Sequence, residues 1–211
     1  MKLAITRRLP YSIRTDRFLR WSRNAFLAAG ILLVGYSGIV LLDMKLYQAN
    51  QARQFEKELK SARSPIARTG GASNLPVAPA SGGSLGKIEI VRIGLAAMIM
   101  EGTDERTLRR SVGHIRGTPL PGQQGNTAIA GHRDTFFRPL RNVRKDDEIT
   151  LTTLDGSSRY LVDFTKVVAP EETQVLGNSG NSTLTLVTCY PFYIVGPAPK
   201  RFIVRAHRIP G

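Results

Sequence analysis

Cysteine is almost absent from this sequence, since Cys189 is the only one among 211 residues. A lone cysteine excludes an intrachain disulfide, so cross-linking cannot explain its presence in a segment that, as the N-terminal pattern indicates, lies outside the cytoplasm. Cys189 ends the run Thr183–Cys189, whose alternating character is typical of a β-strand. The simplest role for this residue is chemical reactivity.

Acidic residues are also scarce, because 16 Asp and Glu stand against 30 Lys and Arg, which gives a formal net charge of +14. In residues 85–211 the basic residues are not arranged as in nucleic-acid-binding proteins, since no run of Lys and Arg there is interleaved with aromatic residues. Seven basic residues and one acidic residue lie within residues 1–24, where membrane topology explains them. Nucleic acid is therefore not an expected partner.

One long apolar run, Ala25–Leu42, contains no charged residue. At helical rise it is about 27 Å long, which is enough to cross the hydrocarbon core of a bilayer. We expect a basic cytoplasmic tail at 1–24, a transmembrane signal anchor at 25–42 and an extracytoplasmic remainder, because basic flanks stay on the cytoplasmic side. A cleaved signal peptide is the alternative, but its apolar core is shorter and small residues follow it, whereas Asp43–Tyr47 follows here.

Residues 43–84 predict a helical stalk followed by a linker. Met44–Arg63 is rich in the good helix formers Gln, Ala, Glu, Lys and Leu. Ser64–Ser84 then mixes Pro and Gly with small polar residues that cannot bury a core. The compact domain is therefore expected at 85–211, a length within the usual range for one hydrophobic core.

The compact domain is predicted to be mostly β. Short alternating segments are bounded by Gly, Pro, Asn or Asp, and Asp155-Gly156 is a hairpin signal between two of them. A short helix or helical turn is expected at Asp104–Arg110 and another at Thr135–Leu140. Many short strands with few helices predict a small closed or nearly closed barrel. The predicted strands are Gly86–Ile93, Ala97–Glu101, Asn126–His132, Glu148–Leu154, Arg159–Val168, Thr183–Cys189 and Arg201–Arg208.

Strand alternation makes the cysteine part of a candidate site. Leu184 and Leu186 share one face of their strand, so Cys189 points to the other face. On the last predicted strand, the same alternation places Arg201 on the face opposite the apolar one. The loop between them, Tyr190–Lys200, is restricted by three prolines, so its shape is largely preset.

A cysteine nucleophile needs a nearby base or cation, because the free thiol is mostly protonated near neutral pH. Of the three histidines, His114 is interpreted as structural and His207 as a solvated surface residue. His132 follows the small apolar segment Thr127–Gly131 and precedes a polar turn, a position at a strand rim that suits acid–base chemistry. His132 is therefore the preferred partner of Cys189.

Three segments around these residues resemble the signatures of one known family: Thr183–Phe192, Gly131–Phe137 and Gly196–Val204. The histidine precedes the cysteine, and the arginine follows the cysteine by twelve positions. In this order the segments are similar to those of the sortases, and most similar to class D. The resemblance covers the region from about Leu85 to Arg208. It implies an eight-stranded sortase-type β-barrel and a cysteine transpeptidase that a single N-terminal transmembrane helix anchors.

Carried over to this sequence, the resemblance implies that Cys189 is the nucleophile, His132 the acid–base partner and Arg201 the group that positions the substrate and stabilises the oxyanion. Family substrates carry an LPxTG-like sorting signal that is cut between Thr and Gly, and a cell-envelope amine accepts the acyl part. The residues then expected to line the peptide groove are Thr188, Tyr190 and Pro197, although Thr188 fits a β-strand interior equally well. No cofactor is expected: calcium activates some relatives, but the carboxylates here form no recognised calcium loop.

Three other functions compete with this interpretation. An L,D-transpeptidase would also use an envelope cysteine, but its nucleophile normally follows a Ser-His-Gly-type string, and Val187-Thr188-Cys189 does not fit. An envelope cysteine protease would use the same thioacyl chemistry with water as acceptor, so amine dependence separates the two. A non-catalytic envelope-binding module would keep Cys189 as a small packed residue that alkylates slowly.

Overall fold

The computed structural model describes residues 13–63, 82–177, 180–194 and 196–210. The chain forms two units, Met1–Asp43 and Met44–Gly211. Residues 1–12 of the predicted cytoplasmic tail and 64–81 of the predicted linker lie outside the described residues. The predicted domain boundaries, after residues 24, 42 and 84, stay predictions.

A single helix, α1 (Ile13–Arg63), spans both the predicted membrane anchor and the predicted stalk. Among the described residues it is the one helix long and apolar enough to cross a membrane. Within the first unit its large apolar side chains are exposed, for example Phe26, Ile31 and Val34. Such a surface fits a lipid solvent, in which apolar side chains need no protein partner.

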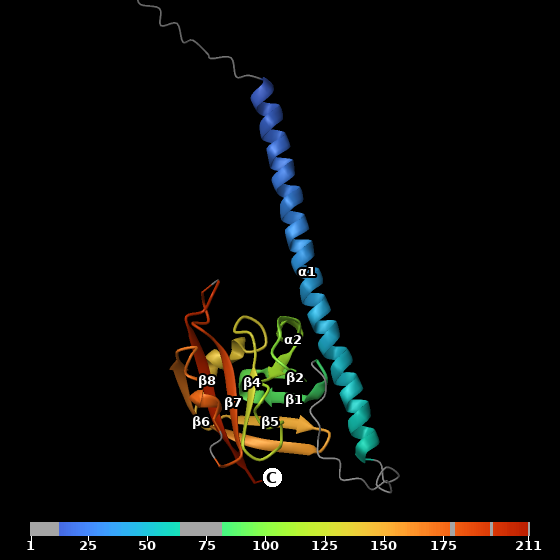
Figure 1. Cartoon of the computed structure of the whole chain (residues 1–211). Coiled ribbons are helices and arrows are strands. Elements are labelled where there is room, and N and C mark those ends of the chain that lie inside the picture. Colours follow the sequence, from blue (N-terminus) through green and yellow to red (C-terminus); the bar gives the residue numbers. More distant parts are fainter. Residues whose placement is uncertain (1–12, 64–81, 178–179, 195, 211) are drawn as a thin grey trace, which may run out of the picture. The chain divides into compact units, whose positions relative to one another are not determined.

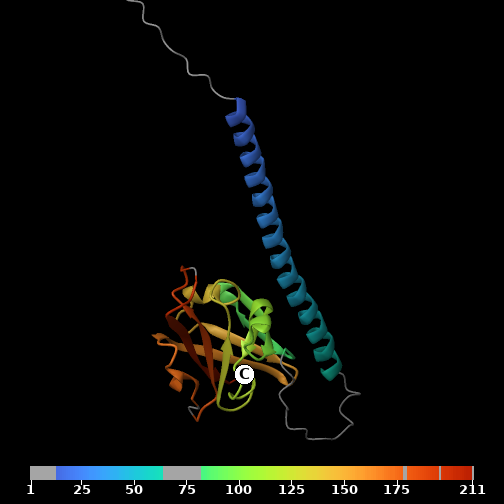
Figure 2. The ribbon, with the colours of Figure 1, turned by 45° about the horizontal axis from the view of Figure 1, so that its top comes forward.

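The second unit contains a closed barrel of eight strands in the order β1-β2-β3-β4-β7-β8-β6-β5. Figures 1 and 2 show the ribbon of this barrel in two orientations. The predicted eight-stranded β-barrel is confirmed. The strands are β1 (Ser84–Ile90), β2 (Leu95–Glu101), β3 (Val112–His114), β4 (Asn126–Ala130), β5 (Glu148–Thr153), β6 (Gly156–Val168), β7 (Thr183–Tyr190) and β8 (Lys200–Ile209). Helix α2 (Glu105–Arg110) and three short 3-10 helices, η2 (Val91–Ile93), η3 (Arg138–Asn142) and η4 (Thr173–Leu176), connect them.

The barrel interior is the hydrophobic core, filled from alternate positions of each strand. Strand β7 supplies Leu184 and Leu186, and strand β8 supplies Val204 and Ala206, all fully buried. The predicted hairpin at Asp155-Gly156 joins β5 to β6, since Thr153 pairs with Gly156. Because these residues of β7 and β8 face the core, the residues between them lie on the outer face of the barrel.

Several predicted boundaries are wrong for local reasons. Strand β1 ends at Ile90, because Val91–Ile93 forms η2, which Gly94 ends with a left-handed φ of 65°. The helical turn predicted at Thr135–Leu140 is η3, which begins later, at Arg138, and has Pro139 in its first turn, where the missing N–H costs no helical hydrogen bond. Strand β4 ends at Ala130, so His132 lies in the loop beyond the strand.

The C-terminal part of α1 packs against strand β2 within the second unit. Phe55 is buried against Met98 and Met100. The amide of Gln48 accepts a hydrogen bond from the Met98 N–H (2.9 Å) and donates one to the Arg110 carbonyl (2.5 Å). The Met98 N–H lies ahead of the β2–β3 pairing, which begins at Ile99, so the Gln48 side chain supplies the partner that a neighbouring strand would otherwise provide.

Candidate active site

The pairing of β7 with β8 places Cys189 directly opposite Arg201, because the antiparallel register joins these two residues. Cys189 is a free cysteine with a half-buried side chain. The alternation that buries Leu184 and Leu186 in the barrel turns Cys189 to the outer face, as predicted. Two residues twelve positions apart in the sequence are therefore neighbours across the sheet.

The pairing of β4 with β7 brings His132 to the same end of the barrel. These strands are parallel, and their register joins Ala130 to Val187. Just beyond β4, the Gly131 N–H donates to the Val187 carbonyl (3.1 Å), and the Thr188 hydroxyl donates to the Gly131 carbonyl (2.7 Å). The residue before His132 is thus fixed to the two residues before Cys189.

The turn after His132 depends on a glycine and a phenylalanine. The Phe137 N–H donates to the His132 carbonyl (3.0 Å), and the Phe137 ring is fully buried in the core. A Cβ atom on Gly131 would lie 2.7 Å from Cδ2 of that ring, closer than carbon atoms can pack. Only glycine therefore fits between β4 and the ring while the turn keeps this shape.

Cys189 and His132 line one cavity of about 690 Å³. Pro197 belongs to the same lining, but Arg201 does not. Nη1 of Arg201 donates to the carbonyls of Ala198 (3.2 Å) and Lys200 (3.1 Å). In the described residues no hydrogen bond joins the Cys189 sulfur to the His132 ring, although the three candidate groups lie at the same end of the barrel.

The three predicted groove residues occupy different environments. Pro197 lines the cavity, as stated above. Thr188 is buried, and its hydroxyl binds the Gly131 carbonyl, so it orients the residue before His132. Tyr190 lies outside the cavity lining and stacks on Phe202, with ring centroids 6.3 Å apart. Contact of these residues with a substrate stays a prediction.

The cavity carries an excess of positive charge. Arg133, Arg138 and Arg141 line it, and Asp134 is the one acidic residue in its lining. Such surroundings favour anionic groups of a bound ligand, or a developing oxyanion, in the cleft. Within the described residues no group of three or more His, Cys, Asp or Glu side chains is placed to hold a metal ion.

Arg133 lines the cavity and has a setting that the sequence did not predict. It is buried, and it donates hydrogen bonds to two carbonyls of the loop between β7 and β8. An arginine in a polar turn normally indicates a solvated surface residue. The one available signal was its position directly after His132.

The other two histidines have partners away from the cavity. His114 is buried in β3, and its Nδ1 lies 2.7 Å from Oε2 of Glu101, which confirms a structural role. His207 is exposed, as predicted, and its Nδ1 lies 2.6 Å from Oδ1 of Asp163. Neither imidazole lines the cavity that holds Cys189.

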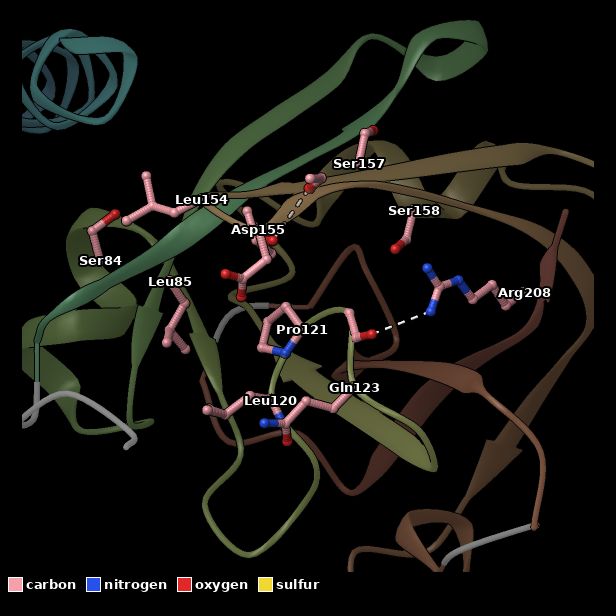
Figure 3. Close-up of a pocket in the computed structure, with 13 residues that line it drawn as sticks. Ser84, Leu85, Leu120, Pro121, Gln123, Leu154, Asp155, Ser157, Ser158 and Arg208 are labelled. Carbon is pink, nitrogen blue, oxygen red and sulfur yellow. Dashed lines mark hydrogen bonds between the residues drawn. The ribbon is translucent and has the colours of Figure 1, made fainter. Parts of the chain in front are cut away.

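A second cavity of about 330 Å³ lies at the other end of β8 (Figure 3). The start of β1, the β5–β6 turn and residues 120–123 line it, and Arg208 donates there to the Gly122 carbonyl (3.2 Å). Cysteine and histidine are absent from its lining. The candidate chemistry therefore belongs to the cavity at Cys189.

Comparison with known proteins identifies the family of this chain. A family model described as the Sortase domain matches residues 88–209. The chain is 33% identical to Sortase D of Bacillus subtilis over 87% of this chain and 95% of that protein. It is 31% identical to Sortase A of Listeria monocytogenes, over 50% of this chain and 49% of that protein.

Solved structures show the same fold. A Sortase D5 transpeptidase of Clostridium perfringens superposes with a TM-score of 0.62 at 27% identity, over 79% of this chain and 98% of that chain. Sortase C1 of Streptococcus suis gives a TM-score of 0.57 at 29% identity, over 62% of this chain and 75% of that chain. The fold and site thus define a barrel-type cysteine transpeptidase.

The chain belongs to the sortase family. Its likeness to Sortase D agrees with the class D-like signatures predicted from the sequence.

Proposed function

We propose that this sortase cleaves an LPxTG-like sorting signal through a thioacyl intermediate on Cys189 and transfers the acyl part to a cell-envelope amine. The observation that supports the proposal is the common cavity of Cys189 and His132, at the strand end where Arg201 pairs with Cys189. In the proposed roles, Cys189 is the nucleophile, His132 the acid–base group and Arg201 a cation beside the cleft, which would hold an extended peptide.

In the first half-reaction the Cys189 thiolate attacks the carbonyl carbon of the scissile bond. The carbonyl oxygen becomes an oxyanion, and the guanidinium of Arg201 turns from the Ala198 and Lys200 carbonyls to donate hydrogen bonds to it. The carbon–nitrogen bond then breaks. The His132 imidazolium gives its proton to the departing amine, which leaves a thioester and a neutral imidazole.

In the second half-reaction an amine of the cell envelope attacks the thioester. Neutral His132 takes the proton that the amine loses, and the sulfur departs as a thiolate, which restores the starting charges. The new amide joins the sorted protein to the envelope. Pro197 and the rest of the β7–β8 loop form one wall of the peptide groove during both steps.

The apolar part of α1 anchors the enzyme in the cell membrane as a single span. The basic residues of segment 1–24 place the N-terminus in the cytoplasm, and the barrel lies outside, where sorted proteins and envelope amines are found.

The proposal is tested with the full-length chain in detergent micelles, an LPxTG-like peptide and a short peptide that has a free α-amine. We expect an amide product whose amount increases with amine concentration. The first product released should be the peptide fragment that begins with glycine. Cys189→Ala and His132→Ala should each abolish the product while the circular dichroism of the barrel stays unchanged. Peptide cleavage at a rate independent of any amine would instead indicate a protease. Normal turnover by Cys189→Ala would show that the reaction does not proceed through a thioacyl intermediate on Cys189.

A further inference from the structure

Arg133 is a charged residue in an unusual setting, because only 8% of its surface is exposed. Its Nη1 donates to the Pro191 carbonyl (3.0 Å) and its Nη2 to the Gly196 carbonyl (2.7 Å). These carbonyls lie 58 and 63 residues away in the sequence, at two points of the loop between β7 and β8. One side chain therefore spans from the segment that carries His132 to the loop that follows Cys189.

An ion pair does not explain the burial of Arg133. Among the described residues no carboxylate lies within 4 Å of its guanidinium, and its hydrogen-bond partners are neutral carbonyls. Removing a guanidinium from water is costly unless its N–H groups are bonded, and bonds from a charged donor are stronger than neutral ones. The planar fork of arginine can bind two separate carbonyls at once, which the single ammonium of lysine does less well.

The loop that Arg133 holds has few other hydrogen bonds. Residues 191–199 form no backbone–backbone hydrogen bond within the described part of the chain. Pro191, Pro197 and Pro199 have no N–H to donate. Besides the two bonds from Arg133, the described residues contain one side-chain hydrogen bond to this loop, which Arg201 donates to the Ala198 carbonyl. The loop extends beyond the strands, orange to red in Figure 2.

Both ends of this loop carry residues of the proposed mechanism, with Cys189 at the end of β7 and Arg201 at the start of β8. Cavity residues Pro197 and Gly196 belong to the loop itself. The position of the loop relative to His132 therefore sets the width of the cleft. Arg133 is the side chain that connects the two sides of that cleft.

We propose that Arg133 is a positioning residue that holds the β7–β8 loop against the His132 segment and so preforms the groove for the sorting peptide. This inference rests on the proposed function, since it assigns the loop to the peptide groove. Without Arg133 the Pro191 and Gly196 carbonyls turn to water, and the peptide must order the loop as it binds. Binding then weakens, while the reactive groups keep their chemistry.

The test compares Arg133→Met, Arg133→Lys and Arg138→Met in the full-length chain in detergent micelles. Arg138 is exposed and lines the same cavity, but its side chain has no hydrogen-bond partner among the described residues, so its variant removes a charge without releasing the loop. Two quantities are measured: kcat and KM for the sorting peptide, and the rate of chymotrypsin cleavage after Tyr193. Tyr193 is 84% exposed in the loop, so its cleavage reports loop mobility without any need for turnover.

We expect Arg133→Met to raise KM about tenfold or more with a smaller change in kcat, and to accelerate cleavage after Tyr193. In Arg133→Lys both KM and the rate of chymotrypsin cleavage should lie between those of wild type and Arg133→Met. Arg138→Met should leave the rate of chymotrypsin cleavage unchanged. If Arg133→Met does not fold, Arg133→Lys carries the same comparison with a smaller shift.

Three results would overturn the assignment: an unchanged KM and cleavage rate in Arg133→Met, full recovery of both by lysine, or equal acceleration of cleavage by Arg138→Met. The last result would mean that charge, rather than the two carbonyl bonds, holds the loop. Absence of transpeptidation in the unsubstituted enzyme would contradict the proposed function alone, because the proteolysis measurement does not depend on it.

Discussion

The contact between Gly131 and Phe137 gives the sharpest stability prediction for the site. In Gly131→Ala the new methyl group would lie 2.7 and 2.8 Å from two ring carbons of Phe137. Carbon atoms pack at about 3.5–4.0 Å, so the ring or the turn must move by about 1 Å. Because Phe137 is fully buried in the core, that movement should cost about 1–3 kcal/mol, as overpacking of cores generally does.

The same movement reaches the active site, because the Phe137 N–H binds the His132 carbonyl and Gly131 precedes His132. Gly131→Ala should therefore lower the transpeptidation rate as well as the free energy of unfolding. Phe137→Leu, which shortens the side chain, should cost about 1–2 kcal/mol by itself through lost contacts. The double variant should be more stable than the sum of the two losses predicts, by about 1 kcal/mol or more, because leucine leaves room for the methyl group.

Urea unfolding of the barrel in detergent micelles, followed by circular dichroism, measures all four proteins, and peptide turnover is recorded in parallel. Wild-type stability in Gly131→Ala would refute the steric argument. Strictly additive losses in the double variant would show that the methyl group and the ring do not meet.

Three further predictions concern contacts outside the cleft. The hydrogen bond from Arg92 lowers the pKa of Asp147, so the carboxylate stabilises the fold above the ordinary pKa of about 3.9, and this contribution is lost as the pH falls through the lower folded-state pKa. Asp147→Asn should thus unfold at lower urea than wild type at neutral pH, with a difference that shrinks below about pH 4; a constant difference would contradict this. Glu101→Gln should cost about 2–4 kcal/mol in urea unfolding, since it removes the buried carboxylate that binds His114; a loss below 0.5 kcal/mol or so would contradict it. Phe55→Ala should speed hydrogen exchange at the amide that Gln48 covers, and unchanged exchange would show that the stalk contact is weak.

The barrel could be predicted because most of its strands carry a period-two pattern long enough to read. Strand β3 was missed because its three residues, Val112–His114, are too few to show a period. Its strand conformation depends instead on its two neighbouring strands, since it pairs parallel with β2 and antiparallel with β4. Local sequence contains no record of such long-range pairing.

The positions of Cys189 and Arg201 could be predicted because they depend on local strand alternation, whereas the hydrogen bonds of Arg133 depend on long-range folding. Cys189 and Arg201 lie on strands whose alternation assigns their faces, and the register confirms that they are neighbours. The side chain of Arg133 reaches 58 residues along the chain to find its partner, and nothing in its own turn predicts that. Thr188 is a similar case, because its bond to Gly131 depends on the parallel pairing of β4 with β7.

The most direct test of the account is the intact mass of the full-length chain mixed with an LPxTG-like peptide in the absence of an amine. We predict a covalent adduct equal to the acyl part of the peptide, located on Cys189 by fragmentation, which disappears on addition of a peptide amine as the amide product forms. Turnover of the peptide without this adduct would contradict the proposed mechanism. So would an adduct that decays at the same rate with and without the amine.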